Sequence, residues 1–487
     1  MDHNTLKTKA IHSIAWSAID RFSDQGVRFL LNIIIARILL PADYGLIGML
    51  AIFIALSNTI AAGGFSFAII QTKNINDVQL STILYANILL GIILYAGLYA
   101  ASDSIAAFYD IEIMSVLVKV MGINILINST TLVQKAVLSR NLHFKKLTII
   151  NLTSTLISGI IGIIAAYSGY GVWSLVIQTL VRNLLIAILY WIIGRWVPLL
   201  VLQFKSVKGL FAFGSKLLVS NIINVIFDNL YLILIGKFYS AKELGYYTRA
   251  YQFNQFPSLS ITHIIIQVFL PVFSKIQDEK ERIVSAYKKS IKLVAFIMFP
   301  LMLGIGAVAK PLILLLLTEK WLPVVPLLQI MVFIGMVFPI HALNMNLLNV
   351  RGRSDLFLRL EIIKKSLIVI AVLLTLPYGI KAMVFGQLVI SFIGFFINTY
   401  YTKKHYNYGA ISQIYDVGKH FILSVAMALI TYLLTTQIPG LLLSLIIPII
   451  FSIAFYLGLS YLFKSEELKE TIKILSGGRF ITIREDK

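Results

Sequence analysis

The stretch ARILLPADYGL at residues 36–46 returns two hundred residues later as GKFYSAKELGY at residues 236–246. The two align without a gap, so that basic, acidic and glycine positions coincide and Gly45 stands opposite Gly245. Self-similarity at a fixed offset is the mark of an internal duplication, and it decides the architecture before any single element is assigned.

A second pair of similar segments appears in the same order, with RNLHFKK at 140–146 and RSDLFLR at 353–359. Its offset is 213 residues, and the extra residues fit a longer loop around EKWLPVVP. The first pair joins hydrophobic segments one to two and seven to eight. The second pair joins segments four to five and ten to eleven, so the repeat unit is six segments. Because six is even, both halves run in the same direction through a membrane, related by an axis along its normal.

The composition is that of an integral membrane protein. Of the 487 residues, 58% are hydrophobic and 13% charged, and the mean hydropathy is +0.87. Apolar runs of about 20 residues recur, each long enough to cross the bilayer as a helix. We predict an all-α polytopic membrane protein with about 14 transmembrane helices, arranged as two parallel six-helix repeats plus two C-terminal helices. The expected parts are an N-terminal lobe (1–200), a C-terminal lobe (201–405), two further helices (406–463) and an amphipathic cytoplasmic tail (464–487).

Charge predicts the orientation. Lys and Arg gather in connections such as KIQDEKERIVSAYKKSIK and VRGRSDLFLRLEIIKK, whereas connections on the other side, such as SGYG and QIPG, have none. By the positive-inside rule both termini are cytoplasmic. The formal charge of +20 is scattered over short loops and forms no basic stripe, so we expect no nucleic-acid partner.

The first predicted span contains ionised residues, in WSAIDRFSDQGVRFLLN at 16–32. Asp20, Asp24 and Arg28 are spaced four apart and share one helix face, with Arg21 beside them. Each charge exposed to lipid at mid-bilayer costs about 2.5–3.5 kcal/mol. The stripe must therefore face protein or a hydrated cavity, and pairing of Asp24 with Arg28 lowers the cost further.

The duplication places a matching polar stripe in the seventh span, where Asn224 and Asp228 take the positions of Asp24 and Arg28. Lys119 and Arg182 add basic groups in other apolar segments. Guanidinium groups bind phosphate oxygens through paired donors. We predict that a diphosphate and its glycan are bound by Arg21, Arg28, Lys119, Arg182 and Asn224, and that charge pairing or coupling involves Asp20, Asp24 and Asp228. The competing interpretation is that intramembrane polar side chains only hold helices together, which we favour for His263 and His341.

Catalytic signatures are missing. The sequence contains no GxxxxGK[ST] motif, no HExxH motif and no cysteine. A membrane glycosyltransferase or polymerase would need carboxylates or histidines on a large outer loop, and the predicted outer loops are short. We expect no enzyme, no catalytic residue, no metal site and no cofactor.

Three segments resemble one family: ARILLPADYGLIGML, GKFYSAKELGYYTRAYQF and LLLTEKWLPVVPLLQIM. They are similar to Wzx-type polysaccharide transporters, flippases of the superfamily that includes the lipid II flippase MurJ and the MATE exporters (the MOP superfamily). The resemblance implies alternating-access transport of undecaprenyl-diphosphate-linked oligosaccharide to the outer leaflet of the bacterial plasma (inner) membrane, for O-antigen, capsule or exopolysaccharide. It also implies a lipid-tail groove in 406–463, and a polysaccharide polymerase and export proteins as partners.

Two other functions stay open from the sequence. A MATE-like exporter of organic cations would have about twelve spans and a cavity dominated by carboxylates, whereas this chain has basic groups in its spans. A structural component of an export complex would have no use for the buried charges. The driving force expected of a flippase is the membrane potential, protons or Na+.

Overall fold

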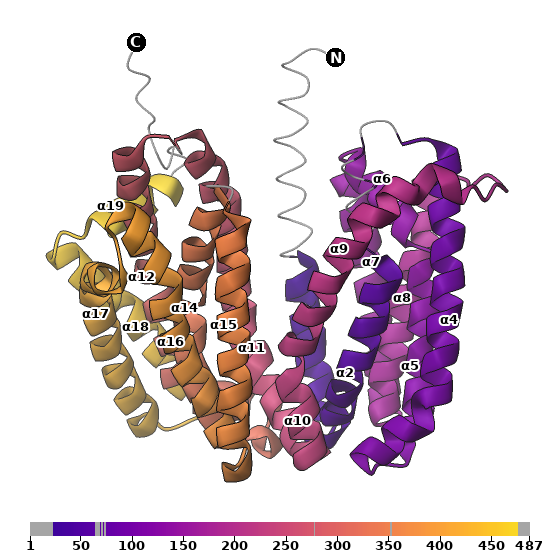
Figure 1. Cartoon of the computed structure of the whole chain (residues 1–487). Coiled ribbons are helices and arrows are strands. Elements are labelled where there is room, and N and C mark those ends of the chain that lie inside the picture. Colours follow the sequence, from indigo (N-terminus) through magenta and orange to yellow (C-terminus); the bar gives the residue numbers. More distant parts are fainter. Residues whose placement is uncertain are drawn as a thin grey trace. The chain divides into compact units, whose positions relative to one another are not determined.

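The chain forms two compact units in a computed structural model (Figure 1): unit 1, Met1–Thr248, and unit 2, Arg249–Lys487. The structure describes residues 23–63, 69, 72, 75–276, 278–350 and 353–475. The unit boundary lies inside α11 (Ala241–Lys275), later than the repeat boundary predicted at residue 200. Unit 1 extends past that point because α9 and α10 pack on α2 and α4; the repeat boundary itself stays a prediction.

Unit 1 is built from helices that pack mainly on their neighbours in sequence, with α4 along α5 and α7 along α8. Residues 23–38 form its first described helix. The others are α2 (Pro41–Ala62), α4 (Asp77–Tyr109), α5 (Ile113–Ser129), α6 (Leu132–Arg140), α7 (Phe144–Tyr167), α8 (Val172–Gly194), α9 (Phe204–Asp228) and α10 (Leu230–Phe238).

Two predicted single spans are bent in unit 1. The axes of α5 and α6 differ by 42°, and those of α9 and α10 by 41°. At the first bend Ser129, Thr130 and Thr131 each donate a hydroxyl hydrogen bond to the carbonyl three residues earlier. Such local bonds compete with the helix ladder and favour a break. At the second bend, the side-chain amide of Asn229 donates to the Val225 carbonyl at 2.8 Å.

The duplicated stretches pack against each other within unit 1. A β-carbon on Gly45 would overlap the carbonyl oxygen of Ala241, the first residue of α11. A β-carbon on Gly245 would overlap the carbonyl oxygen of Pro41, the first residue of α2. Pro41 and Ala241 differ by the same offset as the two glycines, so the contact is reciprocal. Reciprocity of this kind is what a local two-fold axis produces.

Unit 2 is centred on α12 and α14, with α12 packed along α17 and α14 packed along α16. Its last span, α18, packs along α17. The helices that follow α11 are α12 (Lys280–Ala307), α13 (Ala309–Leu317), α14 (Val324–Val350), α15 (Ser354–Thr375), α16 (Ile380–Tyr406), α17 (Ala410–Gln437), α18 (Leu443–Leu462) and α19 (Glu466–Leu475), with short 3-10 helices at Glu319–Trp321 and Leu376–Tyr378.

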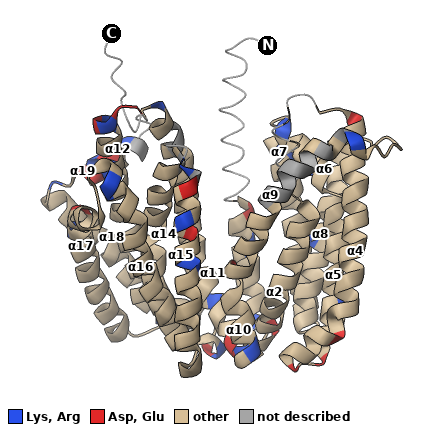
Figure 2. Cartoon of the chain, in the orientation of Figure 1, with Lys and Arg blue, Asp and Glu red and all other residues tan. Residues whose placement is uncertain are grey.

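The polytopic all-α membrane fold is confirmed, although the predicted count of spans is not. Within the described residues, ten helices are long and apolar enough to cross a membrane, or up to twelve if each bent pair is one span. The eleventh of the predicted spans, residues 360–377, corresponds to α15, which is not among these ten helices. Figure 2 shows the reason: α15 carries Lys, Arg and acidic residues along its first half, whereas the middle of α18, which is among the ten, has none.

The predicted tail contains a docked amphipathic helix, α19. Its Leu468 packs on the cluster formed by Phe296, Met427 and Tyr456. The carboxylate of Glu467 lies 3.5 Å from Nε2 of His420, and the hydrogen bond from His420 lowers the pKa of Glu467 to about 2. These contacts tie α19 to the spans of unit 2; its place at the membrane surface stays a prediction.

Candidate functional site

A cluster of charged side chains lies between three helices of unit 1. Asp24 forms an ion pair with Arg28 one turn later on the same helix. Its other carboxylate oxygen accepts a hydrogen bond of 2.5 Å from the Thr155 hydroxyl on α7. That oxygen is also 3.5 Å from Nη2 of Arg182 on α8. The predicted residues Asp24, Arg28 and Arg182 are thus brought together.

Close packing of the helix at 23–38 on α7 brings Asp24 next to Thr155. A β-carbon on Gly159 would overlap the Leu31 side chain, so the helix at 23–38 approaches α7 more closely there than a larger residue would permit. Gly159 is one turn beyond Thr155, and both lie on the same face of α7. Thr155 then bridges the charges, because its hydroxyl donates to Asp24 and accepts from Nε of Arg182 at 3.0 Å.

The cluster has an excess of positive charge, since one carboxylate lies between two guanidinium groups. The side chain of Asp24 is 9% exposed, that of Arg182 21% and that of Arg28 47%. Asp24 is therefore the buried centre, and Arg28 is the accessible group. Asp24 and Thr155 occupy only part of the donor capacity of two guanidiniums, each of which carries five N–H groups. The arrangement suits an oxyanion with several acceptor atoms.

Of the remaining predicted residues, Lys119 has partners outside this cluster. Lys119 is 3.4 Å from Oδ1 of Asp103 and lies 5.2 Å from the ring centroid of Tyr99. Asn224 and Asp228 have exposed side chains on α9. Asp20 and Arg21 fall outside the described residues. Within the part of the chain that the structure covers, no group of three His, Cys, Asp or Glu could hold a metal ion.

A second polar site, which the sequence analysis did not propose, lies in unit 2. Nε2 of His341 on α14 is 3.3 Å from the Ser391 hydroxyl on α16. The side-chain nitrogen of Asn398 donates to Nδ1 of the same ring at 3.1 Å. Nearby on α15, Lys364 forms an ion pair with Glu361. Glu361 and Lys364 fall inside the predicted eleventh span, so the charge argument used for the first span could have found them.

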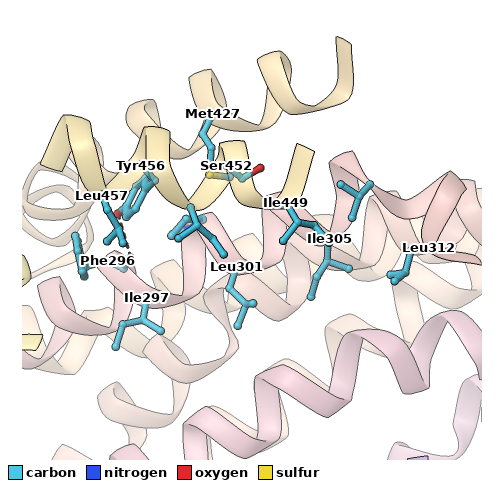
Figure 3. A pocket seen from close by; sticks show the side chains of 14 residues that line it. Phe296, Ile297, Leu301, Ile305, Leu312, Met427, Ile449, Ser452, Tyr456 and Leu457 are labelled. Carbon is cyan, nitrogen blue, oxygen red and sulfur yellow. Dashed lines mark hydrogen bonds between the residues drawn. The ribbon is translucent and has the colours of Figure 1, made fainter. Parts of the chain in front are cut away.

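The third feature is a half-open apolar cavity in unit 2, lined mainly by α12 and α18, with Met427 of α17 and Leu312 of α13 (Figure 3). Its volume is about 450 Å³. Pro300 and Gly304 contribute the α12 side, where Gly304 leaves room beside Met427 of α17. The figure shows aliphatic and aromatic side chains pointing into it, including Leu301, Ile305 and Ile449.

Comparison with known proteins identifies the family of this chain. Residues 34–326 match the family described as "Polysaccharide biosynthesis protein". The chain is 30% identical over 374 residues to the teichuronic acid biosynthesis protein TuaB of Bacillus subtilis, covering 76% of this chain and 77% of TuaB. It is 25% identical to the lipopolysaccharide biosynthesis protein WzxC of Escherichia coli, covering 90% and 89% of the two chains.

The fold also has a counterpart among solved structures. The lipid II flippase MurJ in an inward closed conformation superposes with a TM-score of 0.75 at 17% identity, over 92% of this chain and 98% of MurJ. At that identity the likeness concerns the fold alone. The match to the family model covers more than half of the sequence, and the chain therefore belongs to the polysaccharide biosynthesis protein family of multi-pass membrane proteins.

Proposed function

We propose that this protein is a flippase of the bacterial inner membrane that carries a lipid-linked oligosaccharide from the cytoplasmic to the outer leaflet. The observation that supports this most directly is the Asp24, Arg28 and Arg182 cluster, which holds excess positive charge between the helix at 23–38 and two candidate membrane spans, α7 and α8. A diphosphate carries the complementary charge and several acceptor oxygens. The relatives named for lipopolysaccharide and teichuronic acid biosynthesis supply the cargo class.

In this proposal the two arginines have different tasks. Arg28 is the more accessible and makes the first contact with the diphosphate. Arg182 lies deeper and is oriented by Thr155, so it holds the phosphate oxygens once they have entered. Asp24 keeps both guanidinium groups in place when no anion is bound, since buried cations without a partner are costly.

The lipid tail has a separate place in the proposal. A prenyl chain is apolar and flexible, and the cavity between α12, α17 and α18 is lined almost wholly by apolar side chains. Because the tail would otherwise lie among lipid chains, the cavity would hold it by van der Waals packing, without a gain from its removal from water. Helices α17 and α18 lie in the predicted region 406–463, and the proposed tail site also includes residues of α12.

The test is replacement of the accessible arginine. Arg28→Ala should abolish surface polysaccharide in a host that lacks its own flippase, while lipid-linked precursor accumulates on the cytoplasmic leaflet. Arg28→Lys should restore only part of the export, because an ammonium lacks the paired donors. The matched control is Arg282→Ala, which removes an exposed arginine paired with Glu279 at 2.6 Å.

The same experiment separates the alternatives. Normal export by Arg28→Ala protein would contradict the diphosphate site. Resistance to cationic drugs on overexpression, without a change in surface polysaccharide, would instead indicate a MATE-like exporter. If removal of the whole protein abolishes surface polysaccharide but replacement of Asp24, Arg28 or Arg182 does not, the protein would be a structural component of an export complex. A polymerase and export proteins are the partners that we expect to receive the product.

A further inference from the structure

His341 is held by two partners of different kinds. Ser391 offers a hydroxyl, which can accept a hydrogen bond from Nε2–H whether the ring is neutral or charged. Asn398 offers an amide, and in the structure its Nδ2 donates to Nδ1 of the ring. A ring that accepts at Nδ1 and donates at Nε2 is neutral imidazole. Only the Nδ1 side would have to change if the ring gained a proton.

The Asn398 side chain can accommodate that change. Its amide is 1% exposed, and its Oδ1 is buried without a hydrogen-bond partner. A half-turn of the amide about its terminal torsion exchanges the two ends and places Oδ1 against Nδ1. Oδ1, which has no hydrogen-bond partner in the structure, would then accept a hydrogen bond from Nδ1–H of the imidazolium. The same two side chains therefore support the ring in both protonation states.

Charged neighbours make the proton affinity of the ring sensitive to anions. Lys364 and His341 both lie next to Gly394 of α16. A β-carbon on Gly394 would be 3.8 Å from Cδ of Lys364 and 4.0 Å from Cε1 of His341, so Lys364 is a neighbour of the ring. Within the described part of the chain, Lys364 is the charged group whose field acts on the ring. It is paired with Glu361. The facing side chains of α16 are Ser391, Phe395 and Asn398, none of which is charged.

The ion pair at the edge of this site is only partly buried, since the side chains of Lys364 and Glu361 are 20% and 27% exposed. An anion that approaches Lys364 would weaken the repulsion between its ammonium and a protonated ring. By thermodynamic linkage, anion binding then favours proton binding, and a proton on the ring favours the anion by the same factor.

We propose that His341 is the proton-binding group that couples transport to the proton gradient, with Asn398 as the side chain that turns to accommodate each state. The inference rests on the flippase function proposed above and assigns its driving ion. A proton binds the lone pair of Nδ1 when an anion lies at Lys364 and leaves when that anion is released.

The first experiment uses the full chain in liposomes and fluorescent undecaprenyl diphosphate as the probe. Leaflet exchange is measured with and without an imposed pH gradient, and the ratio of the two rates is the readout. We expect a ratio above one for wild type and near one for His341→Gln. His143→Gln is the control, because His143 is an exposed histidine just before α7.

A second pair of variants keeps the inference testable if His341→Gln does not fold. Asn398→Asp places a fixed negative acceptor beside Nδ1 and should raise the pH midpoint of the gradient effect by about one unit or more. Asn398→Leu can neither donate nor accept, and should lower that midpoint.

The outcomes separate the two proposals. A midpoint that stays the same in both Asn398 variants, or a His341→Gln protein with the wild-type ratio, overturns the inference. Wild-type protein that moves the probe equally with and without a gradient also overturns the inference alone. Wild-type protein that moves no probe overturns the flippase function, and the inference with it.

Discussion

The two polar sites use charge in opposite ways. In unit 1, Asp24 lies between Arg28 and Arg182, and guanidinium groups stay charged at any physiological pH. In unit 2, the Lys364 charge is paired with Glu361, and the neighbouring group is His341, whose ring nitrogens contact neutral side chains. One site presents a permanent positive charge; in our proposal, the other gains and loses a positive charge with its proton.

The difference separates binding from coupling. A site that must hold a diphosphate benefits from cations that cannot lose their protons. A site that responds to a gradient needs a group that changes protonation within the physiological range, and histidine is the side chain suited to this. The following experiments test this division between a binding site in unit 1 and a coupling site in unit 2.

The largest effect should follow from removal of both fixed cations. Arg28→Gln with Arg182→Gln leaves Asp24 without a cationic partner and leaves a diphosphate without charged donors. Each charged hydrogen bond contributes about 1.5–3 kcal/mol, so export per folded protein should fall by more than about a hundredfold. Surface polysaccharide is quantified against the amount of protein in the membrane. Export above a tenth of wild type would contradict a binding role for unit 1.

Neutralising the carboxylate should have the reverse effect on binding. Asp24→Asn keeps the shape of the side chain but removes the charge that competes with phosphate for the two guanidiniums. We expect a lower melting temperature without ligand and about tenfold tighter binding of inorganic diphosphate, measured by thermal shift. Weaker binding would mean that Asp24 organises the site more than it competes with the ligand. Asp103→Asn serves as a control, because its carboxylate is 81% exposed.

A change in unit 2 should move the pH dependence and leave the fixed cations of unit 1 in place. Lys364→Gln removes the ammonium beside His341 and leaves the Glu361 carboxylate unpaired. Both changes favour a proton on the ring, so the midpoint of the gradient effect should shift to higher pH, by about half a unit to one unit. Transport is followed in liposomes from about pH 4 to 8, so that the series begins well below the ordinary histidine pKa of about 6.5. A shift to lower pH would contradict the arrangement.

The smallest effect is expected at Lys119. Its ammonium contacts an exposed carboxylate and an aromatic ring, not the Asp24 cluster, and exposed pairs of this kind contribute little. Lys119→Ala should change export by less than about twofold. A loss comparable with that of Arg28→Ala would restore the predicted role of Lys119 in diphosphate binding.

Sequence reasoning was most successful where a pattern repeats. The pairing of Asp24 with Arg28 follows from a spacing of four on a helix, and the structure confirms it. The aligned glycines marked the duplicated stretch, which the structure shows in reciprocal contact. The involvement of Arg182 came from the cost of a cation in an apolar segment, without knowledge of its partner.

Other parts could not be read from the sequence. Thr155 is one hydroxyl among several on α7, and nothing in its spacing distinguishes the side chain that bridges Asp24 and Arg182. The bend after Ser129 depends on which hydroxyls donate hydrogen bonds to backbone carbonyls of the preceding helical turn. The sequence favours a packing role for His341, with which its hydrogen bonds to α16 agree, but a lone histidine does not reveal that Lys364 and Asn398 from two other helices lie beside it.

The crossing of α2 and α11 at Gly45 and Gly245 has a genetic consequence. What each glycine touches is main chain, and no substitution makes a carbonyl oxygen smaller. A harmful replacement at either position therefore cannot be rescued by trimming the side chain opposite. Suppressor mutations, if selected, should map to places that shift a whole helix, and labels or tags for spectroscopy should be placed away from both positions.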